Sequence, residues 1–169
     1  FAGQGYRATG VNEIIAKSGV AKATFYNHFP TKDDLCLAYL KGLDTFELDS
    51  IKAFVAKKRT PWARFLAVIE SLEPWLQGNN LRGCSFLNMV AEVPDYKSPL
   101  RKAGRKHYQN IRAFIRELSV ALIESDEQHY GMLDPDALAD DYMVIIGGSV
   151  ALTVAFQPTS VGPHTATAT

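Results

Sequence analysis

One stretch decides the fold of this chain, and it reads Thr9-Gly-Val-Asn-Glu-Ile-Ile-Ala-Lys-Ser-Gly-Val-Ala-Lys-Ala-Thr-Phe-Tyr-Asn-His-Phe-Pro-Thr-Lys-Asp-Asp-Leu35. Its pattern predicts two short helices, near residues 11–18 and 21–28, joined at Gly19, because glycine accepts the backbone angles of a tight turn. The residues that would lock the two helices together are apolar: Val11, Ile14, Ile15, Val20, Phe25 and Phe29. The stretch therefore predicts a helix-turn-helix.

The remaining face of the second helix is polar or small, which suits insertion into the major groove of DNA. The residues on this face are Lys22, Ala23, Thr24, Asn27 and His28. Tyr26 would give its hydroxyl to a phosphate, and Lys32 would bind another from the start of the next helix, where free N–H groups also favour an anion. Short helical hairpins also occur in many α-proteins that do not bind DNA, so spacing alone leaves that alternative open.

The run from Gly19 to Leu35 resembles the DNA-binding segment of the TetR family of transcriptional regulators. Upstream, Gly5-Tyr-Arg-Ala-Thr9 resembles the link from that family's first helix to its second, and most of the first helix is expected to be missing from this sequence. Two positions depart from the family pattern. Ala21 stands where Ser or Thr usually caps the recognition helix, which costs about 1 kcal/mol of local stability, and Ala23 replaces a common Gly.

The resemblance implies roles for individual residues and a division into domains. Lys22, Ala23, Thr24 and Asn27 would face bases or nearby backbone, and Thr9, Tyr26, His28 and Lys32 would hold phosphates. A three-helix DNA-binding domain would span 1–44, with its first helix largely missing, and a helical ligand-binding and dimerisation domain would span 45–156. Residues 157–169 carry no apolar pattern and are expected to form a disordered tail.

The whole chain is expected to be all-α, because helical periodicity is common in it and strand-like alternation is scarce. After the two short helices, further helices are predicted near 32–57, 61–76, 83–92, 99–125 and 135–156. Thr31 is the expected N-cap of the first of these, with Asp33 and Asp34 in a first turn where negative charge suits the helix dipole.

Composition narrows the class of protein. Apolar residues make up 47% of the chain, which is enough for a core. Cys36 and Cys84 have neither disulfide-framework nor zinc-site spacing and predict core thiols in a reducing cytoplasm. We expect no metal and no cofactor. We also expect no membrane partner, since the apolar run at 142–156 falls short of the about 20 residues that a membrane span needs.

The last two long helices are candidates for a homodimer interface, because the family's last two helices pack against their twofold mates. The expected interface residues are Ile115, Leu118, Leu122, Ile145, Gly148 and Leu152. The adjacent Gly147 and Gly148 each cost the last helix roughly 1 kcal/mol relative to Ala. This cost is tolerated where another helix must approach closely. The alternative is that these apolar faces belong to the core of a single chain.

An effector pocket is expected among apolar and aromatic side chains of the central helices. Its candidate residues are Trp62, Phe65, Trp75, Phe86, Met89, Tyr108, Phe114 and Tyr142. Such a lining would take a small apolar or aromatic molecule. An effector that binds better to another spacing of the recognition helices would release the operator DNA, and repression is the family's usual mode. For each single residue, an ordinary core position is the alternative.

Two rival functions remain. An enzyme could be drawn around Cys84, His107 and Glu92, but the sequence shows no nucleophile elbow, phosphate loop or metal spacing, so we expect no enzyme. A helical ligand carrier without DNA binding is the second rival, and the intact recognition helix argues against it. The basic residues between Lys97 and Arg116 are expected to form a solvated helix face instead of a second nucleic-acid surface.

Overall fold

The computed structural model describes residue 1 and residues 5–156, and every regular element within them is an α-helix. The all-α prediction is therefore confirmed. The N-terminal part contains α1 (Val11–Ser18) and α2 (Lys22–His28), followed by the long α3 (Lys32–Ala56). The predicted disordered tail, 157–169, lies outside the described residues.

Local chemistry sets the boundaries of the first three helices. Gly19 ends α1 in the left-handed conformation, with φ 68°, where a side chain would be strained. Ala21 precedes α2 with extended angles and no side-chain cap. Thr31 and Asp34 form a capping box at the start of α3, in which Thr31 Oγ1 accepts from the Asp34 N–H and Asp34 Oδ2 accepts from the Thr31 N–H.

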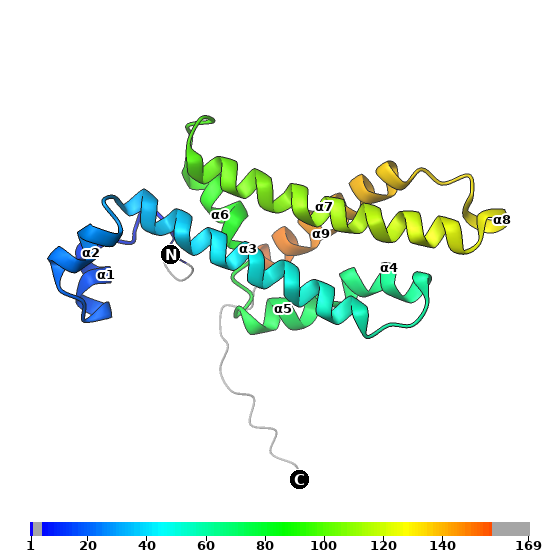
Figure 1. The fold of residues 1–169 in the computed structure, drawn as a ribbon, viewed down its shortest axis with the longest axis horizontal. Helices are drawn as coiled ribbons and strands as arrows, with labels where there is room; N and C mark the ends of the chain where they lie inside the picture. The colour runs from blue at the N-terminus through cyan, green and yellow to red at the C-terminus, as the bar shows by residue number, and fades with distance from the viewer. Residues whose placement is uncertain (2–4, 157–169) are drawn as a thin grey trace, which may run out of the picture.

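The remaining helices build a bundle around the second half of α3 (Figure 1). Their bounds are α4 (Pro61–Glu70), α5 (Leu72–Gly78), α6 (Ser85–Glu92), α7 (Pro99–Ser125), α8 (Glu127–Tyr130) and α9 (Pro135–Ala155). Figure 1 shows α1 and α2 at one end of α3, away from α4 and α5 at its other end. A single helix, α3, thus belongs to both parts of the molecule.

One predicted helix is wrong in its extent. The sequence pattern favoured a continuous helix near 61–76, whereas the structure has a break at Ser71 between α4 and α5. Pro74 explains the break, because proline has no N–H to donate to the carbonyl of Glu70 and its ring collides with that carbonyl in a continuous helix. The four-residue α8 was not predicted.

The core is centred on α7, which packs against α3, α4, α6 and α9. Phe86 of α6 stacks flat on the buried imidazole of His107 of α7, with ring centroids 3.7 Å apart. Gly104 permits this close approach, since a Cβ there would lie 2.6 Å from a methyl group of Val90. The part of the predicted dimer face that lies on α7 is therefore mostly buried inside the chain.

That packing corrects part of the predicted dimer face. Ile115 and Leu122 are 0% and 1% exposed within the single chain, so they cannot contact a partner. The predicted residues on α9 remain accessible to a partner, since Ile145, Gly148 and Leu152 are exposed. Leu118 of α7 is half-buried.

Among the described residues, α9 is also the helix that is long and apolar enough to cross a membrane by length and composition, and 22% of its apolar window is buried.

Candidate nucleic-acid interface and buried cavity

The recognition helix predicted from the sequence presents its polar face to solvent. Lys22, Thr24 and Asn27 are exposed on α2, as are Ala23 and His28. Phe25 is 6% exposed and anchors the helix from its inner side. The arrangement leaves a short helix with free polar side chains, which is the shape that enters a major groove.

Tyr26 lies beside the buried anchor of α2 and is exposed to solvent. Its side chain is 40% exposed. Its ring meets the ring of Phe25 edge-on, with centroids 5.4 Å apart. The ring therefore rests on the anchor of α2 while the residue stays accessible from solvent.

Lys32 is held beside the same surface by Tyr6. The Lys32 Nζ lies over the Tyr6 ring, 4.2 Å from its centroid, and the Tyr6 hydroxyl donates to the carboxylate of Asp33. Burial, followed by the neighbouring Asp33, raises the pKa of Tyr6 well above its usual range, so the hydroxyl stays protonated. The cation of Lys32 is thus held at the start of α3, where a phosphate would also meet free backbone N–H groups.

Thr9 differs from its predicted role. Its side chain is 5% exposed, and its hydroxyl donates to the carbonyl of Gly5 at 2.6 Å. The hydroxyl therefore closes the N-terminal turn in this structure, and it is not presented to solvent as a phosphate ligand.

A contact that the sequence did not predict ties this N-terminal turn to the bundle. Glu92, the last residue of α6, accepts from the backbone N–H of Tyr6 through Oε1 at 3.2 Å and from that of Arg7 through Oε2 at 2.6 Å. Gly5 makes room for the carboxylate, because a Cβ there would lie 2.4 Å from Glu92 Oε1. No local signal reveals this contact, since its partners are 85 or more positions apart.

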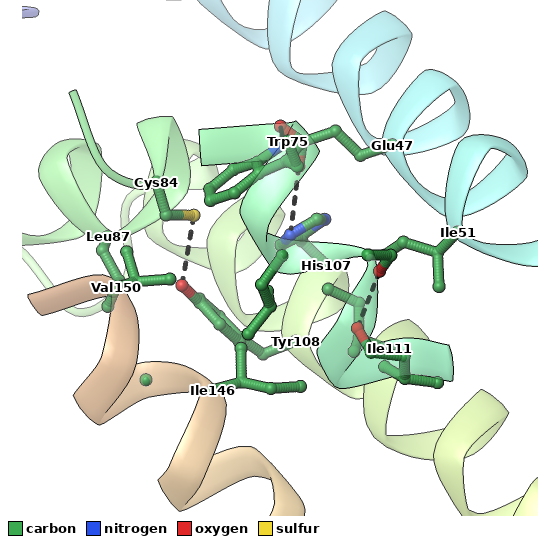
Figure 2. Close-up of a pocket in the computed structure, with 14 residues that line it drawn as sticks. Glu47, Ile51, Trp75, Cys84, Leu87, His107, Tyr108, Ile111, Ile146 and Val150 are labelled. Atoms are coloured by element: carbon green, nitrogen blue, oxygen red, sulfur yellow. Dashed lines mark hydrogen bonds and ion pairs between the residues drawn. The ribbon is translucent and has the colours of Figure 1, made fainter. Parts of the chain in front are cut away.

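A cavity of about 50 Å³ lies inside the bundle, and α3, α4, α5, α6, α7 and α9 contribute to its lining (Figure 2). Trp75 and Tyr108 are the two predicted pocket residues that line it. The other six predicted residues do not line it: Trp62, Phe65, Phe86, Met89, Phe114 and Tyr142. Most of these six fill the core, and Trp62 is 49% exposed and stacks on Tyr130.

Polar groups gather at one wall of this cavity. Trp75 Nε1 donates to Glu47 Oε1 at 3.2 Å, and His107 Nε2 lies 3.5 Å from Glu47 Oε2. On its other side, His107 Nδ1 pairs with Asp44 Oδ1 at 2.8 Å, and Asn110 donates to Asp44 Oδ2 at 2.9 Å. Figure 2 shows Glu47, Trp75 and His107 converging. Neither Glu47 nor Asp44 could be predicted here, because single acidic residues on a helix carry no local signal of burial.

Burial determines the charge of this wall. It raises the pKa of Glu47 to about 7, partly offset by the hydrogen bond from Trp75. Burial also lowers the pKa of His107, partly offset by Asp44. His107 is therefore neutral near pH 7, and a neutral ring with its proton on Nδ1 turns the Nε2 lone pair toward Glu47.

The residues of the hypothetical enzyme site serve other purposes. Tyr108 donates its hydroxyl to Cys84 Sγ at 3.2 Å, and burial raises the pKa of the Cys84 thiol, so the thiol stays protonated. Glu92 binds the backbone of Tyr6 and Arg7. Within the described residues there is no group of three His, Cys, Asp or Glu side chains that could hold a metal ion.

Known proteins that are similar to this chain are transcriptional regulators, and the similarities cover different parts of it. The model of the family described as bacterial regulatory proteins, tetR family, matches residues 1–39. The curated transcriptional regulator AcuR of Cereibacter sphaeroides is 28% identical over 153 residues, which are 87% of this chain and 68% of that protein. The HTH-type transcriptional repressor DhaR of Mycobacterium sp. strain GP1 is 28% identical over 148 residues, which are 83% of this chain and 69% of that protein.

Solved structures extend the similarity to the bundle. A TetR-family transcriptional regulator from Streptomyces coelicolor superimposes with a TM-score of 0.68 and 26% identity, over 91% of this chain and 84% of that one. A regulatory protein TetR from Rhodobacter sphaeroides gives a TM-score of 0.70 at 24% identity, over 89% of this chain and 80% of that one. The second likeness shows the shared fold over that part of the chain.

Proposed function

The chain belongs to the TetR family of DNA-binding transcriptional regulators, and on this premise we propose that it is a repressor that binds a near-palindromic operator as a homodimer and leaves it when a small apolar or aromatic effector binds. The observation that carries the proposal is the polar, solvent-exposed face of α2 on its buried Phe25 anchor. The family is not one of enzymes, so the buried thiol and imidazole are not read as a catalytic pair.

The DNA contacts are proposed residue by residue. Lys22, Ala23, Thr24 and Asn27 face base edges or adjacent backbone from α2. Tyr26, His28 and Lys32 bind phosphates around them. Thr9 contributes by closing the turn ahead of α1, through its hydrogen bond to Gly5.

The dimer is proposed to form through α9 with its twofold mate. Several apolar or small residues are exposed on this helix, and the partner would cover Val144, Ile145, Gly148 and Leu152 among them. A Cβ built on Gly148 meets nothing within 4 Å inside the chain, so a partner helix can approach closely there. Twofold symmetry places two recognition helices about 34–36 Å apart, on one face of the duplex.

Release of the operator is proposed to run through α3. Glu47 and Ile51 of this helix line the cavity, and Thr31 caps the same helix beside α2. An effector that repacks the cavity therefore acts on the helix that carries the DNA-binding part, and it shifts the population away from the DNA-competent spacing. We propose that residues 1–44 form the DNA-binding domain. Residues 45–156 form the domain that binds the effector and the partner subunit. A regulator of bacterial operators works in the cytoplasm.

The test is a selection of random duplex DNA by the full-length protein at a stated salt concentration. Enrichment of a near-palindrome is the expected result, and it supplies the operator for effector screening. A folded, dimeric protein that enriches no sequence and shows no salt-dependent affinity for DNA would instead be a ligand carrier.

A further inference from the structure

We propose that the buried cavity takes a small hydrophobic amine, whose ammonium group binds the carboxylate of Glu47. This inference rests on the proposed function, because it names the chemical class of the effector. Three observations support it: the charges that line the cavity, the unfilled hydrogen-bonding capacity of Glu47, and the apolar character of the remaining wall.

The charge of the lining excludes anions. Glu47 and His107 are the two lining side chains that can carry charge near neutrality, and no lysine or arginine lines the cavity among the described residues. His107 is held neutral by its burial, which lowers its pKa. A carboxylate or phosphate ligand would therefore face Glu47 without any counter-charge, whereas a cation would find a buried partner.

Glu47 has capacity to bind such a cation. A carboxylate offers about four lone-pair sites. Within the described residues, Oε1 takes the indole N–H of Trp75, and Oε2 has the imidazole nitrogen of His107 at 3.5 Å. The residue is 8% exposed, so water supplies little compensation. An ammonium group carries three donors on a compact charge, which this carboxylate can accept.

The rest of the wall fits a short hydrocarbon. Ile51, Leu72, Ile111, Ile146 and Val150 line it with methyl and methylene groups. The volume of about 50 Å³ is well below that of an apolar cavity of about 150 Å³ that holds benzene. The hydrocarbon part is therefore short, of a few carbon atoms at most.

Glu47 also connects the ligand to the DNA-binding part. It lies on α3, one helical turn after Asp44, which pairs with His107. An ammonium group that draws Glu47 into the cavity changes the contact between α3 and α7. The same helix begins at the capping box beside α2.

The test uses three molecules of matched size and different charge: n-butylamine, n-butanol and butyrate. The two tryptophan indole N–H signals of the full-length protein are followed by nuclear magnetic resonance at pH 8 during each titration. Trp75 donates to Glu47, whereas Trp62 stacks on Tyr130 outside the cavity, so Trp62 is the internal control, and Trp62→Phe assigns the signals. We expect butylamine to shift the Trp75 signal with at least tenfold higher affinity than butanol, and butyrate to leave it in place.

Variants separate the carboxylate from the cavity. Glu47→Gln should lower butylamine affinity at least tenfold, to the level of butanol, and leave butanol affinity unchanged. Glu73→Gln, at an exposed glutamate of α5, should change neither. If Glu47→Gln fails to fold, the wild-type series still decides the proposal.

Two outcomes distinguish this inference from the function on which it rests. Equal affinity for butylamine and butanol, or binding of butyrate, would overturn the amine inference and leave the repressor function standing. Preferential binding of butylamine at Trp75, together with an operator complex that stays intact at saturating amine, would uphold the assignment of the cavity and contradict effector-driven release.

Discussion

The backbone N–H of Arg7 donates to Oε2 of Glu92 at 2.6 Å, across 85 positions of the sequence. The other oxygen of Glu92 takes the N–H of Tyr6 at 3.2 Å. Glu92 is the last residue of α6, whose Leu87 lines the cavity. One carboxylate therefore joins the bundle to the turn that leads into the helix-turn-helix.

Glu92→Ala is expected to loosen that turn and lower operator affinity about tenfold, since a hydrogen bond to a charged group is worth roughly 1.5–3 kcal/mol. Glu92→Gln keeps one acceptor oxygen and should fall between Ala and wild type. Fluorescence anisotropy on the selected operator measures both, with Glu124→Gln on the surface of α7 as the matched control. Wild-type affinity in Glu92→Ala would show that the contact does not order the DNA-binding part.

Lys32→Ala is expected to weaken binding on every DNA sequence and to reduce the salt slope by about one, because it removes one phosphate contact. Thr24→Ala and Asn27→Ala should instead change base preference at single operator positions. Binding is measured by anisotropy across a salt series. An unchanged affinity and slope for Lys32→Ala would contradict the docking of α2 in the groove.

Ala21→Ser is expected to stabilise the protein by about 0.5–1 kcal/mol. Ala21 has extended N-cap angles, φ −60° and ψ 139°, with no side-chain hydrogen bond to the helix, and serine would supply an acceptor for the free N–H groups of α2. Thermal unfolding followed by circular dichroism measures the change. Ala23→Ser, inside α2, is the control and should not stabilise. A melting temperature that does not rise in Ala21→Ser would rule out the missing cap as a source of instability.

Leu152→Glu is expected to convert the protein from dimer to monomer, because it places a charge on the exposed apolar face of α9. Light scattering coupled to gel filtration gives the mass. Met132→Glu, at a side chain that is 99% exposed between α8 and α9, should remain dimeric. A dimeric Leu152→Glu would place the interface elsewhere.

Glu47 predicts a pH-dependent stability. Burial raises its pKa from 4.5 to about 7, so its protonated form is favoured by folding. Its contribution is fully present below pH 4.5 and is lost as the pH rises through about 7. The groups that face it are Asp44 on its own helix, His107 and Tyr108 of α7, and Cys84 before α6.

Relative to Glu47→Gln, which does not titrate, the wild type should therefore lose about 2–3 kcal/mol of unfolding free energy between pH 4.5 and 7. Subtracting the variant removes the titration of the groups that do not contact Glu47. Urea unfolding at a series of pH values measures it. A difference between the two proteins that stays constant over this range would show that Glu47 is ionised throughout.

Much of the fold could be read in the sequence because its signals are local. Gly19, Thr31, Pro61, Pro99 and Pro135 mark helix boundaries through the backbone angles they allow and the N–H groups they cap or lack. The same holds for the polar face of α2, where the spacing of apolar residues along one helix shows which side chains remain outside. The break at Ser71 is not evident from the apolar pattern, because that pattern continues on both sides of Pro74.

The cavity could not be read in the same way. Trp75 and Tyr108 were among its predicted residues, but Phe86, Met89 and Tyr142 have the same chemistry and fill the core instead. Whether an apolar side chain lines an empty space or fills it depends on how well several helices fit together, which no single helix encodes. Ile115 and Leu122 show the same limit, since they have the spacing of an interface and the burial of a core.

The sequence by itself determined that this protein is helical and that α2 offers a polar face on an apolar anchor, because both follow from contacts a few residues apart. Tertiary structure alone decided that Glu92 holds the backbone of Tyr6 and Arg7, and that Glu47, Trp75 and His107 share one buried wall. The physical reason is that burial and charge pairing depend on the packing of helices distant in sequence, and that packing shifts the pKa of Glu47 and leaves the apolar face of α9 uncovered.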